Sequence, residues 1–245
     1  MKMRLDRWLT TLGEGSRSQL QKTIRQGKVT VDGRVITDPG YGCETDTAVL
    51  CLNGQVLDGR LQRHVLLNKP SGLLTAARDK KQPTIMDLLP PVYASIGCMP
   101  VGRLDKDTTG LLFLTTDGEL NHRLLSPTRH VDKVYRATVD GPLTEADVAA
   151  FAAGLKLSDF DALPAKLEIL SSTAAEAVAL VTVQEGKFHQ VKRMFSAVGR
   201  EVTALRRLSF GPLELDPALE EGAWRELTED EMRSLYQAAR MEETP

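Results

Sequence analysis

The chain has 245 residues, 42% of them hydrophobic, and its 31 Lys and Arg against 33 Asp and Glu give a formal net charge of −2. This composition is typical of a globular protein with one or two domains, and no apolar run approaches the ~20 residues that span a membrane. The first residues are polar and charged, so we expect no secretory or transit segment and a cytoplasmic protein. Three scattered cysteines without a CxxC pair exclude a disulfide framework and argue against a structural zinc site.

The charge is unevenly distributed along the chain. Residues 2–34 carry eight Lys and Arg against three acids, a balance of +5, whereas residues 214–245 carry three bases against ten acids, a balance of −7. Because phosphate binding depends on the local field and not on the total charge, the basic N-terminal region is compatible with an RNA-binding protein. We interpret the acidic C-terminal region as solvated helix and loop.

The N-terminal residues 1–58 predict a small α+β unit. Leucines recur at helical spacing in a first short helix, and Ser16 is a suitable N-cap for a second helix over residues 17–26. The dipeptide Asp32-Gly33 between two apolar pieces is a strong hairpin signal. The strand-like pieces of this unit are 29–31, 35–36, 48–52 and 55–57. Residues 59–63 follow as a predicted flexible linker.

The remaining residues, 64–245, predict a larger α+β domain with a mostly antiparallel sheet. Thr144 is a suitable N-cap for a helix over residues 144–154, and Thr228 with Glu231 forms a capping box at the start of the last helix. The other predicted elements are strands at 65–68, 111–115, 135–139 and 178–183 and a helix at 190–198.

Several cations lie on or beside the two N-terminal helices and present a basic surface of the size of an RNA groove. On charge alone, a solvated helical surface explains them equally well. The order of residues from Arg4-Leu5-Asp6 through Ser16-Arg17 to Asp32-Gly33 resembles the S4 RNA-binding module over residues 3 to about 58. The resemblance implies RNA contacts from the following side chains: Arg4, Arg17, Lys22, Arg25 and Lys28.

The densest set of reactive side chains lies between Gly102 and Gly118. Arg103, Asp105, Asp107 and their neighbours directly precede an apolar strand, which places polar groups at the rim of a sheet, where sites are usually built. On the pattern alone, a charged hairpin is the simpler explanation. In an extended segment Asp105 and Asp107 would point to opposite faces, which argues against the paired carboxylates of a glycosidase.

This stretch resembles the signature of the pseudouridine synthases, in their RsuA-type branch. Three further segments fit the same family: residues 67–72, Lys133-Val134-Tyr135, and residues 185–195 followed by Gly199. With the S4-like region, the resemblance covers nearly the whole chain. It implies an α+β catalytic domain, 64–245, of two subdomains around a shared, mostly antiparallel central sheet.

The function implied by the resemblance is isomerisation of one uridine to pseudouridine in small-subunit (16S) rRNA, either naked or in an assembly particle. A large-subunit (23S) rRNA synthase shares every catalytic motif and stays open as an alternative. An alternative of another class is a non-catalytic S4-type RNA-binding or ribosome-assembly factor. That alternative is disfavoured because a mere binder does not need Asp105, Tyr135 and Lys192 together.

The resemblance also implies the roles of individual residues. Asp105 is the expected nucleophile, and Lys192 is the cation that would favour its ionised form. Tyr135 would stack on the flipped-out uracil and help to move the proton that leaves C5, and Leu205 would pack against the base. The side chains expected to orient the nucleophile loop or to contact RNA are Arg103, Lys187, His189 and Arg193.

We expect no cofactor and no metal. The histidines at 122, 130 and 189 are not at metal-ligand spacing, and no GxxxxGK[ST] motif indicates nucleotide hydrolysis. Nothing in the pattern indicates an obligate dimer, so we expect a monomer whose partner is rRNA.

Overall fold

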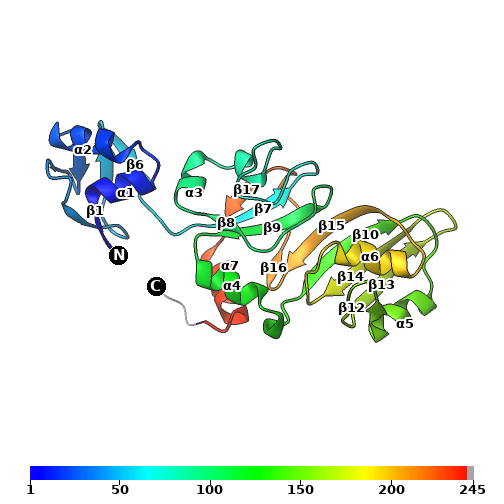
Figure 1. The fold of residues 1–245 in the computed structure, drawn as a ribbon. Coiled ribbons are helices and arrows are strands. Elements are labelled where there is room, and N and C mark those ends of the chain that lie inside the picture. The colour runs from blue at the N-terminus through cyan, green and yellow to red at the C-terminus, as the bar shows by residue number, and fades with distance from the viewer. Residues whose placement is uncertain (242–245) are drawn as a thin grey trace. The chain divides into compact units, whose positions relative to one another are not determined.

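The computed structural model describes residues 1–241 and divides the chain into two compact units (Figure 1). The first unit comprises residues 1–63 and 89–99, and the second comprises residues 64–88 and the chain from Pro100 onward. Residues 59–63, the predicted linker, therefore belong to the first unit. The last residues of the acidic C-terminal region, 242–245, lie outside the described residues.

The first unit is α+β, as predicted. Its helices are α1 (Leu5–Thr11), α2 (Arg17–Arg25) and α3 (Pro91–Ser95). Within the described residues its strands form a sheet of order β3-β2-β5-β6 and a separate antiparallel pair, β1-β4. The strands are β1 (Lys2–Arg4), β2 (Val29–Val31), β3 (Arg34–Val35), β4 (Gly42–Glu44), β5 (Leu50–Leu52) and β6 (Gln55–Leu57).

Local signals in the sequence explain how this unit folds. Ser16 and Gln19 form a reciprocal capping box at the start of α2. Asp32 and Gly33 both have positive φ, as the predicted two-residue hairpin between β2 and β3 requires. The fully buried Trp8 donates its indole N–H to the carbonyl oxygen of Gly59 at 2.9 Å, which holds the predicted linker against this unit.

The second unit is built on one large sheet. Within residues 1–241 the strands follow the order β13-β14-β10-β15-β9-β7-β17. All neighbours on this path are antiparallel except β15 and β9, which pair in parallel over two residue pairs. The prediction of a mostly antiparallel central sheet is confirmed. The strands on this path are β7 (His64–Lys69), β9 (Thr109–Thr115), β10 (Lys133–Val139), β13 (Lys166–Ser172), β14 (Ala177–Val183), β15 (Val202–Phe210) and β17 (Trp224–Glu226).

Helices and short strands complete the second unit. Residue 144 is the predicted N-cap of α5 (Glu145–Ala153), and residue 228 is the N-cap of α7 (Glu229–Ala238), where Glu231 completes the predicted capping box. The remaining elements are α4 (Gly118–Leu125), α6 (Gln190–Ala197), the 3-10 turns Ile85–Leu88 and Pro127–Arg129, and the strands β11 (Leu155–Lys156), β12 (Asp161–Ala162) and β16 (Leu213–Glu214). Strand β8 (Met99–Pro100) spans a point in the sequence at which the chain passes from the first unit to the second.

The sequence did not reveal all of these elements. Strand β15 carries Arg206 and Arg207 at its centre, where a strand pattern predicts apolar residues. Helix α4 begins at Gly118, which suggests a turn, but the Asp117 side chain accepts from the Leu120 N–H and caps the helix.

The interpretation of the acidic C-terminal region as solvated helix and loop is wrong for its described part. Strand β17 pairs with β7, and α7 buries Leu235 and Tyr236 in one hydrophobic cluster with Phe113. On these two elements Glu229 and Asp230 are exposed and Glu226 and Glu231 are partly exposed, so that a charge count cannot distinguish the elements from a solvated tail. Among the described residues, no helix combines the length and the apolar character that crossing a membrane requires.

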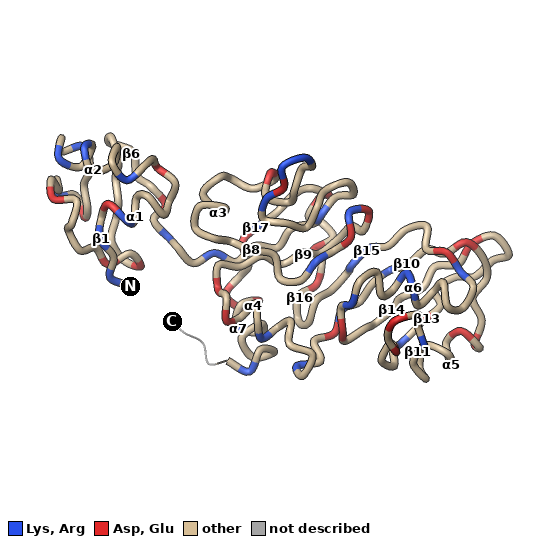
Figure 2. The backbone as a smooth tube through the Cα atoms, in the orientation of Figure 1, with Lys and Arg blue, Asp and Glu red and all other residues tan. Residues whose placement is uncertain are grey.

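Charged positions occur on both units (Figure 2). On the first unit, Lys and Arg positions lie on and beside α1 and α2, with acidic positions among them. Asp6 on α1 is fully buried and accepts hydrogen bonds from Arg4, Arg17 and Gln21. The Arg4 guanidinium holds the pKa of the Asp6 carboxyl well below its usual range.

Candidate active site

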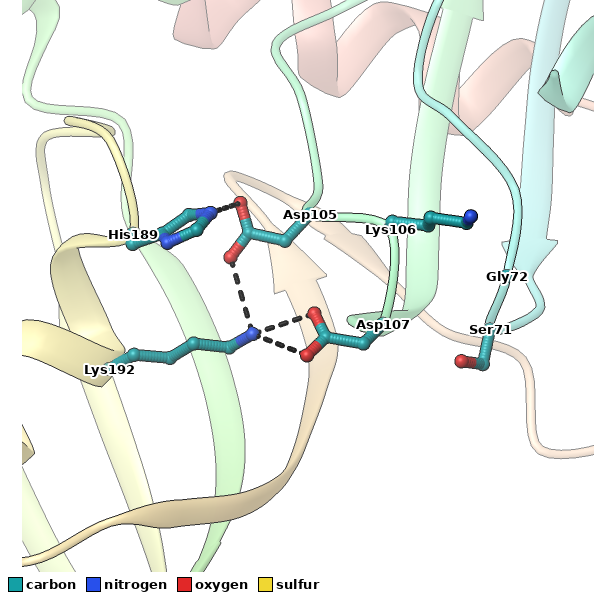
Figure 3. A pocket seen from close by; sticks show the side chains of 7 residues that line it. All are labelled: Ser71, Gly72, Asp105, Lys106, Asp107, His189 and Lys192. Atoms are coloured by element: carbon teal, nitrogen blue, oxygen red, sulfur yellow. Dashed lines mark hydrogen bonds and ion pairs between the residues drawn. The ribbon is translucent and has the colours of Figure 1, made fainter. Parts of the chain in front are cut away.

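The loop before β9 folds as a tight turn around Asp105. The backbone N–H of Thr108 donates to the carbonyl oxygen of Asp105 at 3.1 Å, which closes the turn over Lys106 and Asp107. As a result the side chains of Asp105 and Asp107 point the same way (Figure 3). The prediction that they point to opposite faces is wrong, because it assumed an extended segment.

Two side chains from the segment after β7 hold this loop in place. The fully buried Lys69 ammonium donates to the carbonyl oxygens of Pro70, Lys106 and Thr108 at 3.0, 3.1 and 3.0 Å. The Thr75 hydroxyl donates to the carbonyl oxygen of Leu104 at 2.7 Å and accepts from its N–H at 3.2 Å. Burial lowers the pKa of Lys69 to about 8, against the opposing effect of nearby carboxylates.

Gly110 brings the other end of the loop against β15. It pairs in parallel with Arg207, and its φ is +97°. A Cβ at this position would collide with the backbone carbonyl oxygen of Arg207. Only glycine allows this close approach of the two backbones. The approach places the Asp105 loop where the two antiparallel parts of the sheet meet.

Helix α6 and its N-cap residue supply the Lys192 and His189 side chains that face the loop. The ammonium nitrogen of Lys192 lies 2.6 and 2.8 Å from the two carboxylate oxygens of Asp107 and 3.7 Å from Oδ2 of Asp105. Nε2 of His189 lies 3.5 Å from Oδ1 of Asp105. Figure 3 shows Lys192 between the two carboxylates and the His189 ring on the far side of Asp105. The hydrogen bond from Lys192 lowers the pKa of Asp107.

These side chains line an open pocket of about 500 Å³. Three segments of the second unit contribute to it, and its lining residues are Ser71, Gly72, Asp105, Lys106, Asp107, His189 and Lys192. This volume lies in the range of roughly 300–1,000 Å³ that is typical of small-molecule sites. Its lining includes two carboxylates and two lysine side chains, so that the pocket suits a polar ligand.

Asp105 also lines a second, narrower pocket. Tyr135 from β10 and Leu205 from β15 line it together with Asp105 and Thr108. Tyr135 and Leu205 are both buried, and Ala137, two residues after Tyr135 on β10, pairs with Leu205. Among residues 1–241, the Thr108 hydroxyl is one of the buried polar groups without a hydrogen-bond partner in the protein. An aromatic ring, an aliphatic side chain and a free hydroxyl beside a carboxylate can hold a planar polar base.

Comparison with known proteins identifies the family of the chain. Residues 63–197 match the family described as RNA pseudouridylate synthase, and residues 3–49 match the S4 domain. The chain belongs to the RNA pseudouridylate synthase family. The expected family and the S4 domain at the N-terminus are thereby confirmed.

Relatives of this synthase match it along nearly its whole length. An uncharacterized RNA pseudouridine synthase of Bacillus subtilis is 42% identical over 95% of this chain and 98% of its own. A protein of Pseudomonas aeruginosa named ribosomal small subunit pseudouridine synthase A is 40% identical over 95% of this chain and 100% of its own. A crystal structure of a pseudouridylate synthase matches with a TM-score of 0.67 at 36% identity, covering 95% of this chain and 99% of the other.

Other cations that the sequence predicted as RNA contacts of this synthase already have partners in the second unit. Lys187 and Arg193 lie over the Phe160 ring, with the charged atoms 4.1 and 4.9 Å from its centroid. Arg193 also pairs with Asp159, and Lys187 lies 3.6 Å from Glu185. The two cations are therefore held in place next to α6. Arg103 is exposed beside the narrower pocket.

The predicted RNA contacts of the S4 domain fall into two groups. Arg4 and Arg17 pair with buried Asp6, although more than half of each side chain stays exposed. Lys22, Arg25 and Lys28 are exposed on and after α2. The first two side chains stabilise this domain, whereas the other three are accessible to a phosphate.

Sequence reasoning missed several residues of the site. Lys69 and Thr75 lack any pattern that would relate them to a loop some 30 to 40 residues further along, and only the fold shows that they bind it. Lys106 donates to the Gln82 side chain at 2.8 Å and so ties the loop to the segment before Ile85–Leu88. No group of three or more His, Cys, Asp or Glu side chains able to hold a metal ion occurs within the described residues.

Proposed function

We propose that this protein converts one uridine of small-subunit (16S) rRNA to pseudouridine, with Asp105 as the nucleophile. The observation that carries the proposal is that Asp105 lines two pockets, one that also contains Lys192 and one that also contains Tyr135, Leu205 and Thr108. The target RNA is inferred from the relative in Pseudomonas aeruginosa, whose name specifies the ribosomal small subunit and which this chain matches over its full length.

The chemistry defines what Asp105 must do. The bond between C1′ of the ribose and N1 of the uracil breaks, the uracil turns while it stays bound, and C5 forms the new bond to C1′. The proton on C5 is then lost, and N1 gains one. A carboxylate assists by adding to C6 of the uracil or by acting at C1′, and only its ionised form is nucleophilic.

The surroundings of Asp105 suit this role. The Lys192 ammonium lies at ion-pair distance and favours the ionised carboxylate. Tyr135 is positioned to stack on the flipped-out uracil and to take part in transferring the C5 proton, while Leu205 packs against the opposite side of the base. The Thr108 hydroxyl is available to a uracil carbonyl.

The N-terminal module provides a second RNA-binding surface besides the catalytic domain. We propose that residues 1–58 bind rRNA through Lys22, Arg25 and Lys28, and that 59–63 connect this module to the catalytic domain, 64–245. A second RNA-binding surface of this kind raises the effective concentration of the target uridine at the active site. The protein would act as a monomer in the cytoplasm, where the rRNA is assembled, without a metal or cofactor.

Pseudouridine mapping tests this proposal. Both large rRNAs are mapped with a chemistry that marks pseudouridine, in cells that lack the protein and in the same cells carrying wild type, Asp105→Asn or Asp161→Asn. Asp161 is an exposed carboxylate on β12 and serves as the matched control. We expect one small-subunit site to disappear and to return with wild type and Asp161→Asn, but not with Asp105→Asn.

The other outcomes separate the alternatives. Loss of a large-subunit site would retain the nucleophile and replace the substrate. Loss of no site in either RNA would overturn the rRNA assignment and favour a binding or assembly role. Purified Asp105→Asn should still bind rRNA with the affinity of wild type, because the substitution removes reactivity without removing a cation.

A further inference from the structure

Phe188 exposes an aromatic ring next to the proposed nucleophile. It is 71% exposed, the largest value among the exposed large hydrophobic residues within the described part of the chain. Single exposed apolar side chains are common on protein surfaces and need no explanation by themselves. Phe188 is distinguished by the side chain that lies behind its ring.

The rings of Phe188 and His189 form a stacked pair. Their centroids are 3.8 Å apart and their planes differ by 17°. The Nε2 atom of the same His189 ring lies 3.5 Å from Oδ1 of Asp105. One face of Phe188 is thus covered by a ring that contacts the nucleophile, and the high exposure of Phe188 leaves its other face open to solvent.

The loop that presents the two rings is braced by its own side chains. The buried Gln190 side chain donates to Glu185 at 2.7 Å and accepts from the N–H of Lys187 at 3.0 Å. His189 has a left-handed backbone with φ +50°, a conformation that is uncommon outside glycine and that recurs at functional sites. A ring held in this way loses little freedom when a ligand stacks on it.

The charges around this pair suit RNA. Lys187 precedes Phe188 in the chain, and the Arg193 guanidinium reaches back to the carbonyl oxygen of Phe188 at 3.5 Å. Both cations are held over the Phe160 ring beside the loop. Exposed aromatic rings with cations beside them bind unpaired nucleobases, because the ring stacks on the base and the cations attract the phosphates.

We propose that Phe188, supported by His189, is a stacking platform for an unpaired nucleobase that flanks the target uridine. The base lies on the open face of Phe188 and is separated from Asp105 by the His189 ring. Stacking of the neighbour keeps the strand open while the target uridine occupies the pocket at Asp105. The inference rests on the proposed function in one respect, namely that the ligand is RNA with a target uridine.

The test uses the full-length protein and a short single-stranded oligoribonucleotide with a central uridine flanked on each side by 2-aminopurine, whose fluorescence falls when it stacks. Binding and quenching are measured for wild type, Phe188→Leu, Phe188→Tyr and Leu170→Ala. Leucine keeps an apolar side chain without an aromatic face, tyrosine restores the ring, and Leu170 is a control that is exposed on β13. Thermal unfolding of each variant verifies that the fold is intact.

We expect Phe188→Leu to lose most of the quenching and to bind the oligonucleotide about five-fold or more weakly, the lower end of the loss for one stacked base. Phe188→Tyr and Leu170→Ala should match wild type within about two-fold. Equal quenching and affinity for Phe188→Leu and wild type would overturn the stacking proposal.

Turnover on transcribed small-subunit rRNA is measured separately for the same proteins. Stacking that depends on Phe188, with no turnover by wild type, would retain the platform and reject the proposed substrate. Turnover by wild type with unchanged binding by Phe188→Leu would retain the proposed function and reject the platform. The two proposals therefore fail independently.

Discussion

Lys192 is bound more closely by Asp107 than by the proposed nucleophile. Its ammonium nitrogen lies 2.6 Å from Oδ1 of Asp107 and 3.7 Å from Oδ2 of Asp105. The exposed Asp107 carboxylate therefore competes with Asp105 for the same cation, and it adds a second negative charge beside Asp105. Lys192 is therefore shared between two carboxylates in the free enzyme.

Substituting Asp107 by Asn should consequently leave Lys192 to interact with Asp105 alone. We expect single-turnover pseudouridine formation at neutral pH to be at least as fast as in wild type, because the ammonium group is no longer shared between two carboxylates. Asp159→Asn is the control, since Asp159 is a similarly exposed carboxylate that pairs with Arg193. A rate that falls about ten-fold or more in Asp107→Asn alone would show that Asp107 positions Lys192 and does not compete with Asp105 for it.

Removal of the Lys192 charge should impair the reaction more than substrate binding. Lys192→Met leaves both carboxylates without their shared cation, and we expect kcat to fall roughly 100-fold, similar to the loss of one stabilising donor in other active sites. Lys166→Met removes an exposed lysine on β13 and should have no effect. Single-turnover pseudouridine formation measures the chemical step. A change confined to KM would instead indicate that Lys192 only attracts RNA.

The buried Lys69 should limit activity at alkaline pH. Its pKa is lowered to about 8 by burial, so above this pH it becomes neutral and donates fewer hydrogen bonds to the carbonyl oxygens of the nucleophile loop. We expect kcat to fall as the pH rises through about 8. Lys69→Arg, which stays charged, should extend activity to higher pH even if its maximum is lower.

Global stability should respond to Lys69 in the opposite direction. The unfolded chain keeps this lysine protonated up to about its ordinary pKa of 10.5, so it binds more protons than the folded protein between pH 8 and 10.5. The contribution of Lys69 to stability therefore rises over this window.

Lys133 provides the control for the activity prediction. It is also buried, with a pKa of about 8, so Lys133→Arg should leave the alkaline loss of activity unchanged.

The Thr75 hydroxyl should be required to hold the nucleophile loop. Thr75→Val keeps the shape of the side chain but leaves both the N–H and the carbonyl oxygen of Leu104 without this partner. We expect a loss of about 1–3 kcal/mol in the free energy of unfolding, measured by urea denaturation, together with a lower kcat. Thr75→Ser retains the hydroxyl and should stay close to wild type. Equal behaviour of the valine and serine variants would contradict this role.

Asp6 should make the first unit sensitive to acid. Its pKa is held well below the usual range, first of all by the Arg4 guanidinium, so its contribution to stability is complete above the unfolded pKa of about 4 and is lost as the pH falls below it. Asp6→Asn should cost about 1–2 kcal/mol near neutral pH, because the paired arginines are largely solvated, and should remove this acid dependence. Circular dichroism during acid titration compares the two proteins. RNA affinity should not fall, since Arg4 and Arg17 become free.

The elements that the sequence predicted are those with local signals. The N-cap at Ser16, the N-cap at Thr144 and the Asp32-Gly33 turn each depend on residues a few positions apart, and all three occur in the structure. Strand β15 was missed because Arg207, although buried, is a charged residue that interrupts the apolar pattern expected of a buried strand. In the structure the Arg207 Nε donates to the carbonyl oxygen of Leu111 at 2.7 Å, a partner that no local pattern reveals.

The candidate site shows the same difference between local sequence signals and contacts that join distant parts of the chain. Family motifs placed Asp105 and Lys192 as functional residues, and the structure brings them within 3.7 Å. The competing position of Asp107 depends on a turn that Lys69 and Thr75 hold from distant parts of the chain. Phe188 lies in the family-like segment 185–195, but its exposure and its stacking on His189 become visible only in three dimensions.

The pairing of β7 with β17 has a consequence for the order in which the protein becomes competent during synthesis. Strand β7 carries Lys69 to the nucleophile loop, and its outer edge pairs with β17, while Asn68 donates to the carbonyl oxygen of Leu219, 151 residues later. Until residues 224–226 have left the ribosome, that edge lacks its backbone partners. We expect a nascent chain that lacks residues 224–226 to be inactive, so that the modification of RNA has to wait until β17 has been synthesised and has paired with β7.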